Sequence, residues 1–118
     1  MIAAENIRDW RGHDVVDPDG HRIGTLESIY VDTVSDTPFF CTIIVGLPTR
    51  RRLVFAPLMG ASVGPEYLKI HYSKDLVKDA PSIDTDGELL ADQEWSVFDH
   101  YKLPFEPGAR GERRLARR

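Results

Sequence analysis

Short runs of alternating apolar and polar residues fill the first two thirds of the chain. Alternation of this kind predicts strands, because successive side chains of a strand point to opposite faces. The expected strands span residues 14–17, 23–33, 39–45, 52–56 and 67–72. Both alternating sets of 39–45 are largely apolar, so we expect this strand at the centre of the sheet, buried on both faces.

A turn with defined chemistry joins the first two strands. In Asp17-Pro18-Asp19-Gly20 the proline presets φ, an aspartate can bond nearby backbone and the glycine accepts positive φ. This pattern predicts a β-hairpin. Apolar residues in 23–33 are irregularly spaced, which indicates a bulge or a bend, with Gly24 as the position where the strand can bend.

Helical patterning is confined to two later segments. Ser73 is placed to cap a short turn over 74–78, and residues 91–102 have the apolar spacing of an amphipathic helix. From Pro104 onward Pro, Gly and Arg dominate, so residues 104–118 are expected to be a disordered basic tail. This gives an all-β fold, a small barrel or half-open roll of about five to six strands, with a C-terminal helical extension.

Length and composition are those of one small domain. The chain has 118 residues, and no apolar run approaches the roughly 20 residues of a membrane span. No secretory signal is evident at the start, and the single cysteine, Cys41, excludes an internal disulfide framework. We therefore expect a soluble, cytoplasmic protein with no membrane partner.

Charge is distributed unevenly. Five of the fifteen basic residues and one acid follow residue 109, so this tail carries +4 and residues 1–109 carry −8. An acidic body is poorly suited to bind nucleic acid, whose phosphates are also negative. We expect the tail to be attracted loosely to its own body or to a second copy, and to bind nucleic acid only weakly.

An ordered set of motifs resembles the PRC-barrel family, named after the photosynthetic reaction-centre H subunit. The set comprises Gly12 to Val16, Asp19-Gly20, Ile23-Gly24, Asp32, Phe55-Ala56-Pro57-Leu58, Tyr72-Ser73-Lys74-Asp75 and Ala80-Pro81. The resemblance places a barrel domain at 8–80 and a helical extension, as in stand-alone members, at 81–103. It implies an adaptor that docks on other proteins or complexes; a related barrel forms the C-terminal half of a ribosome-maturation factor.

Catalytic and metal-binding constellations are not apparent. The segment from Asp17 to Gly20, followed by Glu27, only partly matches a calcium loop, and the four histidines are scattered. Cys41 falls in the most apolar strand, where burial makes a thiol inert. We therefore expect no catalytic residues, no metal and no cofactor.

Two clusters are candidate interaction residues. The first is the turn Arg50-Arg51-Arg52, either a solvated loop or a contact for an acidic partner or phosphate. The second is the aromatic side of the last helix, Trp95, Phe98 and Tyr101, which either packs on its own barrel or forms a protein interface.

These observations favour a non-enzymatic protein–protein interaction module with an unidentified protein partner, self-associating as a homodimer through the open strand edges and the aromatic helix. The alternative is an RNA- or ribosome-associated accessory protein acting through the basic tail. A small-ligand or enzymatic site at a barrel mouth is a third class.

Overall fold

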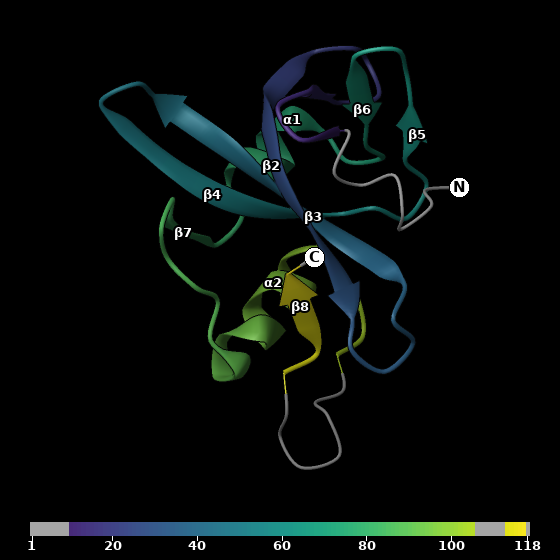
Figure 1. The fold of residues 1–118 in the computed structure, drawn as a ribbon, viewed down its shortest axis with the longest axis vertical. Coiled ribbons are helices and arrows are strands. Elements are labelled where there is room, and N and C mark those ends of the chain that lie inside the picture. The colour runs from purple at the N-terminus through teal and green to yellow at the C-terminus, as the bar shows by residue number, and fades with distance from the viewer. Residues whose placement is uncertain (1–9, 106–112, 118) are drawn as a thin grey trace.

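The computed structural model describes residues 10–105 and 113–117, which form one strand-rich unit (Figure 1). The strands are β1 (Asp14–Val16), β2 (Arg22–Asp32), β3 (Pro38–Leu47), β4 (Arg50–Pro57), β5 (Ser62–Val63), β6 (Tyr67–Lys69), β7 (Ser82–Asp84) and β8 (Leu115–Arg117). The helical elements are α1 (Lys74–Lys78), the 3₁₀ turn η2 (Ala91–Gln93) and α2 (Glu94–His100). None of the helices in these residues has the length and hydropathy needed to span a bilayer.

The β1–β2 hairpin forms as the turn chemistry predicts. Gly20 has a φ of +85°, and its N–H donates to the Asp17 carbonyl at 2.9 Å. The two strands pair antiparallel, with Asp14 opposite Thr25. On its other side β1 pairs in parallel with β6.

Strands β2, β3 and β4 form the long antiparallel centre of the sheet. β3 lies between the other two, and its residues from Phe40 to Ile43 are buried, which confirms the expected central strand. The register of β2 against β3 shifts between Leu26 and Ser28, so the expected bulge is present but lies beyond Gly24. At Gly24 the backbones approach closely: an added Cβ would lie 2.2 Å from the Ile44 carbonyl oxygen.

The sheet is not closed into a barrel. Its strands follow the order β5-β6-β1-β2-β3-β4-β7, with β8 attached to β2 outside this path. The all-β class is confirmed coarsely, whereas closure and a count of five to six strands are wrong for the described residues. The added strands are short pairs, such as Ser62–Val63, which are difficult to distinguish from loops in the sequence.

The two helices pack against the strands and contribute buried side chains to the same hydrophobic core. Ser73 caps α1 as expected, accepting a hydrogen bond from the Leu76 N–H at 3.3 Å. The second helix is shorter than the predicted 91–102: it starts as η2, and its α-helical part ends at His100. Its apolar face is buried, and the Tyr101 hydroxyl just beyond it donates to the Phe55 carbonyl at 2.6 Å.

Residues 113–117 correct the expectation of a disordered tail. They include β8, which pairs antiparallel with the end of β2 and lies beside α2 (Figure 1). The Leu115 side chain is buried at 1% exposure. One buried leucine and specific polar contacts order a segment whose composition alone predicts disorder. The expected disorder of 106–112 and 118 falls outside the described residues.

Candidate functional site

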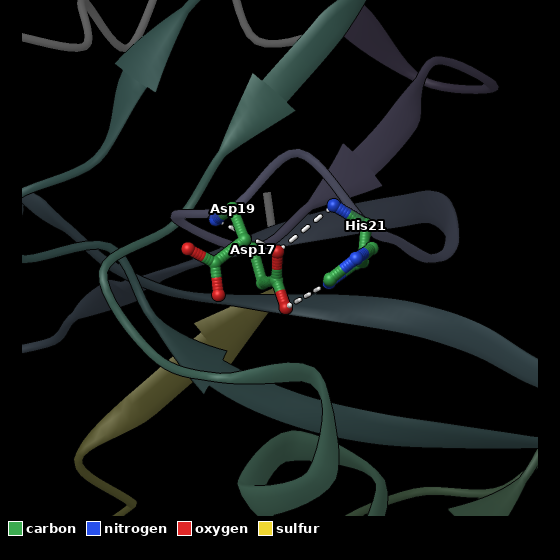
Figure 2. A group of neighbouring side chains, drawn as sticks. All are labelled: Asp17, Asp19 and His21. Carbon is green, nitrogen blue, oxygen red and sulfur yellow. Dashed lines mark hydrogen bonds and ion pairs between the residues drawn. The ribbon is translucent and has the colours of Figure 1, made fainter.

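The Asp17 turn gathers two acids and a histidine (Figure 2). Potential ligand atoms of Asp17, Asp19 and His21 all lie within 4.8 Å of one another. However, Asp17 Oδ1 accepts from the N–H groups of Asp19 and His21, at 3.0 and 2.9 Å, and Oδ2 accepts from the Lys74 N–H at 3.3 Å. The carboxylate thus joins the hairpin turn to the start of α1, a structural role that accounts for the cluster.

Burial opposes ionisation of Asp17, yet the hydrogen bonds from His21, Lys74 and Asp19 hold its pKa below the ordinary value. The turn therefore favours the charged carboxylate over the neutral acid.

The aromatic cluster of the last helix does not form one surface. Phe98 and Tyr101 are buried, at 2% and 5% exposure, and stack with Phe40 and Tyr72 in the core. Trp95 points outward and is 55% exposed. The alternative in which this helix packs on its own chain therefore holds for Phe98 and Tyr101, and only Trp95 is available to a partner.

The three arginines of the predicted turn lie at the start of β4. Together they line one side of a cleft of about 590 Å³, which Asp84 and Glu88 also line. The Arg52 guanidinium donates to the Lys78 carbonyl at 2.8 Å, so this arginine joins β4 to α1. Arg50 and Arg51 are exposed, as a solvated loop or a partner contact requires.

Many hydrogen bonds and ion pairs surround β8 and the two residues before it. The strand pairs with Tyr30, Val31 and Asp32 of β2. Immediately before it, the Thr33 N–H donates to the Arg114 carbonyl at 2.9 Å and the Thr33 hydroxyl donates to the Arg113 carbonyl at 2.6 Å. We call the surface that receives residues 113–117 the β2-edge groove. It comprises the end of β2 with Thr33, the carboxylates of Glu27, Glu88 and Glu94, and the Leu89 carbonyl.

Glu94 is the buried anchor of this groove. At 1% exposure, its Oε1 accepts from the Arg114 N–H and its Oε2 from the Leu115 N–H, both at 2.8 Å. These charge-assisted bonds satisfy the two backbone donors at the entry to β8. The sequence predicts only that Glu94 belongs to the amphipathic helix expected over 91–102.

Each of Arg113, Arg114 and Arg117 pairs with a carboxylate, and Arg113 also donates to a backbone carbonyl. Arg114 pairs with Asp32 through two bonds, Nη2 to Oδ2 at 2.7 Å and Nε to Oδ1 at 3.3 Å. Arg117 pairs with Glu27. Arg113 pairs with Glu88 and also donates to the Leu89 carbonyl at 2.6 Å. The expected attraction of the tail to its own body is therefore present, but as defined pairs and not as a loose association.

The Asp32–Arg114 pair is well shielded, with side-chain exposures of 13% and 17%. Burial opposes ionisation of Asp32, but hydrogen bonds from Arg114 and from the Val34 N–H, together with the Arg114 charge, lower its pKa. The pair is therefore formed between full charges at neutral pH. Its forked geometry selects an arginine, because a lysine ammonium cannot donate in parallel to both oxygens.

Cys41 is buried, as its place in the apolar strand predicts. The thiol is fully buried, and burial raises its pKa to about 12. A thiolate, the reactive form, is therefore scarce at neutral pH.

Comparison with protein-family models and with curated proteins found no match to this chain.

Proposed function

We propose that this protein is a non-enzymatic protein-interaction module whose β2-edge groove recognises a short, extended, basic segment. The observation that carries the proposal is the seating of residues 113–117 in that groove. The partner that we infer presents the pattern Arg-Arg-apolar-x-Arg. The chain's own segment, Arg-Arg-Leu-Ala-Arg, has this pattern and occupies the groove in the absence of a partner.

As in other strand-addition sites, one set of contacts provides affinity and another provides specificity. Backbone pairing with β2 is independent of sequence, whereas separate side-chain positions read the segment. Asp32 selects the second arginine, and the site of Leu115 selects an apolar residue. A groove with these features suits an adaptor better than a catalyst.

The resemblance to PRC-barrel domains supports the same class of function, since such domains dock on other proteins. The homodimer expected from the sequence would then arise by strand exchange, because a second copy carries the same segment. Intramolecular seating competes at an effective concentration on the order of millimolar. Exchange is therefore favoured only at high protein concentration or when the segment is released.

RNA or ribosome association through the tail is the second candidate, and it has less support. Arg113, Arg114 and Arg117 are engaged by carboxylates, so phosphate binding would have to displace these pairs. Phosphate contacts would also act against an acidic body.

The test uses the full chain and a fluorescent peptide, Arg-Arg-Leu-Ala-Arg. Leu115→Asp disfavours intramolecular seating and leaves the groove intact, so this variant should bind the peptide saturably. The unsubstituted chain should bind the peptide at least about tenfold more weakly, because its own segment occupies the site. Adding Glu94→Gln to Leu115→Asp should abolish much of the binding, and a peptide with Asp in place of Leu should not bind.

A matched control is Leu47→Asp, the same change at an exposed position away from the groove, which should behave like the unsubstituted chain. If Leu115→Asp proves unfolded by circular dichroism, Arg114→Asp provides a second way to release the segment. Folded variants that do not bind the peptide would refute the proposed function. Salt-labile RNA retention that requires the tail arginines would favour the second candidate instead.

A further inference from the structure

A second cleft, separate from the β2-edge groove, is lined by cations. Its volume is about 630 Å³, within the range of roughly 300–1,000 Å³ typical of small-molecule sites. It lies between the start of β2, the β3–β4 turn and α1. Its charged lining residues are Arg22, Arg51, Lys74 and Lys78.

The positive charge in this cleft is largely uncompensated. Arg22 pairs with Asp14 at 2.8 Å and also donates to the Thr25 hydroxyl, so its charge is partly neutralised. In contrast, the side chains of Arg51, Lys74 and Lys78 have no hydrogen bond or ion pair within 10–105 and 113–117. No carboxylate lines the cleft among these residues.

The fold brings the three cations together from two distant segments. Lys74 and Lys78 are four residues apart on α1 and therefore lie on the same face of that helix. Arg51 reaches the cleft from β4, opposite Gly46 of β3. Like charges four residues apart on a helix repel each other. The chain as a whole carries −4, so the convergence of three cations in one cleft favours an anionic occupant.

The remaining lining suits the organic part of a ligand. Leu47, which is 72% exposed, and the half-buried Ile44 contribute accessible apolar surface. The turn at Gly46 has a φ of +102°, and an added Cβ there would lie 2.4 Å from the Arg50 carbonyl oxygen. A larger residue at Gly46 would therefore distort the turn that holds Arg51 beside the cleft.

We propose that this cleft binds a small ligand carrying two or more phosphate groups. The phosphates lie between Arg51, Lys74 and Lys78, and the organic part rests on Ile44 and Leu47. Guanidinium and ammonium groups are the side chains that recognise phosphate, the former in a bidentate manner. This site is independent of the β2-edge groove and of the peptide that we propose for it.

The experiment is calorimetric titration of the full chain with pyrophosphate, and separately with adenosine triphosphate, at low ionic strength. Saturable binding at one site per chain is expected. Arg51→Gln and the double variant Lys74→Gln, Lys78→Gln should each weaken pyrophosphate binding by about tenfold or more, since each removes charge-assisted contacts. Because these side chains make no bonds in the described structure, the variants should keep their melting temperature.

Arg50→Gln is the matched control, because Arg50 is the adjacent arginine but lines the other cleft. It should leave pyrophosphate affinity within about twofold, as expected for a screened surface charge. Absence of saturable binding, or an equal loss in Arg50→Gln, would overturn the proposal. A single-stranded RNA that binds the chain and is weakened equally by Arg50→Gln and Arg51→Gln, with no saturable pyrophosphate site, would indicate diffuse electrostatic attraction and would also overturn it.

Discussion

The carboxylate of Glu94 accepts a hydrogen bond from the Leu115 N–H at 2.8 Å, joining residues 21 positions apart, both of them buried. Its other oxygen accepts from the Arg114 N–H at the same distance. One acid at the start of α2 thereby holds the entry to β8 against the end of β2.

Replacing Glu94 with Gln should destabilise the chain. The amide keeps one acceptor oxygen but turns an NH₂ group toward a backbone N–H, leaving buried donors without an acceptor. The cost of such a change is about 1–3 kcal/mol in the free energy of unfolding. Urea denaturation followed by circular dichroism measures it.

Glu88→Gln is the matched control for that substitution. The Glu88 side chain is 69% exposed and pairs with Arg113 at the rim of the groove. Its loss should change the unfolding free energy by less than about 1 kcal/mol. Equal effects of the two substitutions would contradict the anchoring role of Glu94.

Local chemistry made much of the fold predictable. The Pro18-Asp19-Gly20 turn, the Ser73 cap and the doubly apolar β3 each have a cause within a few residues, and all three are confirmed. β8 was not predictable in this way, because its order depends on acids distant in sequence. Only Leu115 and Ala116 are apolar there, and Arg114 becomes a structural residue only when Asp32 and Glu94 surround it.

The candidate site residues illustrate the same limit. The sequence indicated that Phe98 and Tyr101 are important but not which way they face, since helical spacing gives one apolar stripe whether it meets a core or a partner. The cluster at Arg50 to Arg52 was recognisable, whereas Lys74 and Lys78 join Arg51 only through the packing of α1.

Two glycines should respond differently to alanine. At Gly24 the new Cβ would lie 2.2 Å from the Ile44 carbonyl oxygen, so the β2 and β3 backbones must separate, at a cost of about 1–3 kcal/mol or more. At Gly20 nothing lies within 4 Å, and only the φ of +85° is penalised, by about 1–2 kcal/mol.

Asparagine separates the two mechanisms, because it tolerates positive φ better than alanine but does not relieve a clash. Gly20→Asn should recover part of the stability lost in Gly20→Ala, while Gly24→Asn should be at least as unstable as Gly24→Ala. Urea midpoints decide between them. Recovery at Gly24 would show that close backbone approach is not the constraint there.

Acid should destabilise the chain through Asp17 and Asp32. Both have a folded-state pKa below the ordinary 3.8, so the stability they contribute is fully present above that value. It is lost as the pH falls through the ordinary value toward the folded one. The unfolding free energy should therefore fall progressively as the pH is lowered below about 5.

Asp32→Asn should be less stable at neutral pH and show a shallower decline over the same range, because its titrating group is gone. Chemical denaturation at several pH values measures both slopes. An unchanged slope in Asp32→Asn would mean that Asp32 has the same pKa in the folded and unfolded states.

Cys41 should resist thiol reagents in the native protein. Its thiol is buried and its pKa is raised to about 12, so both access and thiolate formation are suppressed. A chromogenic disulfide reagent at pH 8 should react negligibly with the folded chain and stoichiometrically in guanidinium. Rapid native labelling would place the thiol at an accessible position.

Amide hydrogen exchange of Leu115 tests most directly whether a peptide can replace β8 in the β2-edge groove. In the unsubstituted chain its N–H donates to Glu94, so exchange should be slowed relative to an unstructured peptide. Saturating peptide Arg-Arg-Leu-Ala-Arg should displace the chain's own segment and accelerate Leu115 exchange, with amides of the central strand β3 unaffected. Exchange that is unprotected from the start, or protected and unchanged by the peptide at any concentration, would contradict the β2-edge groove as a recognition site.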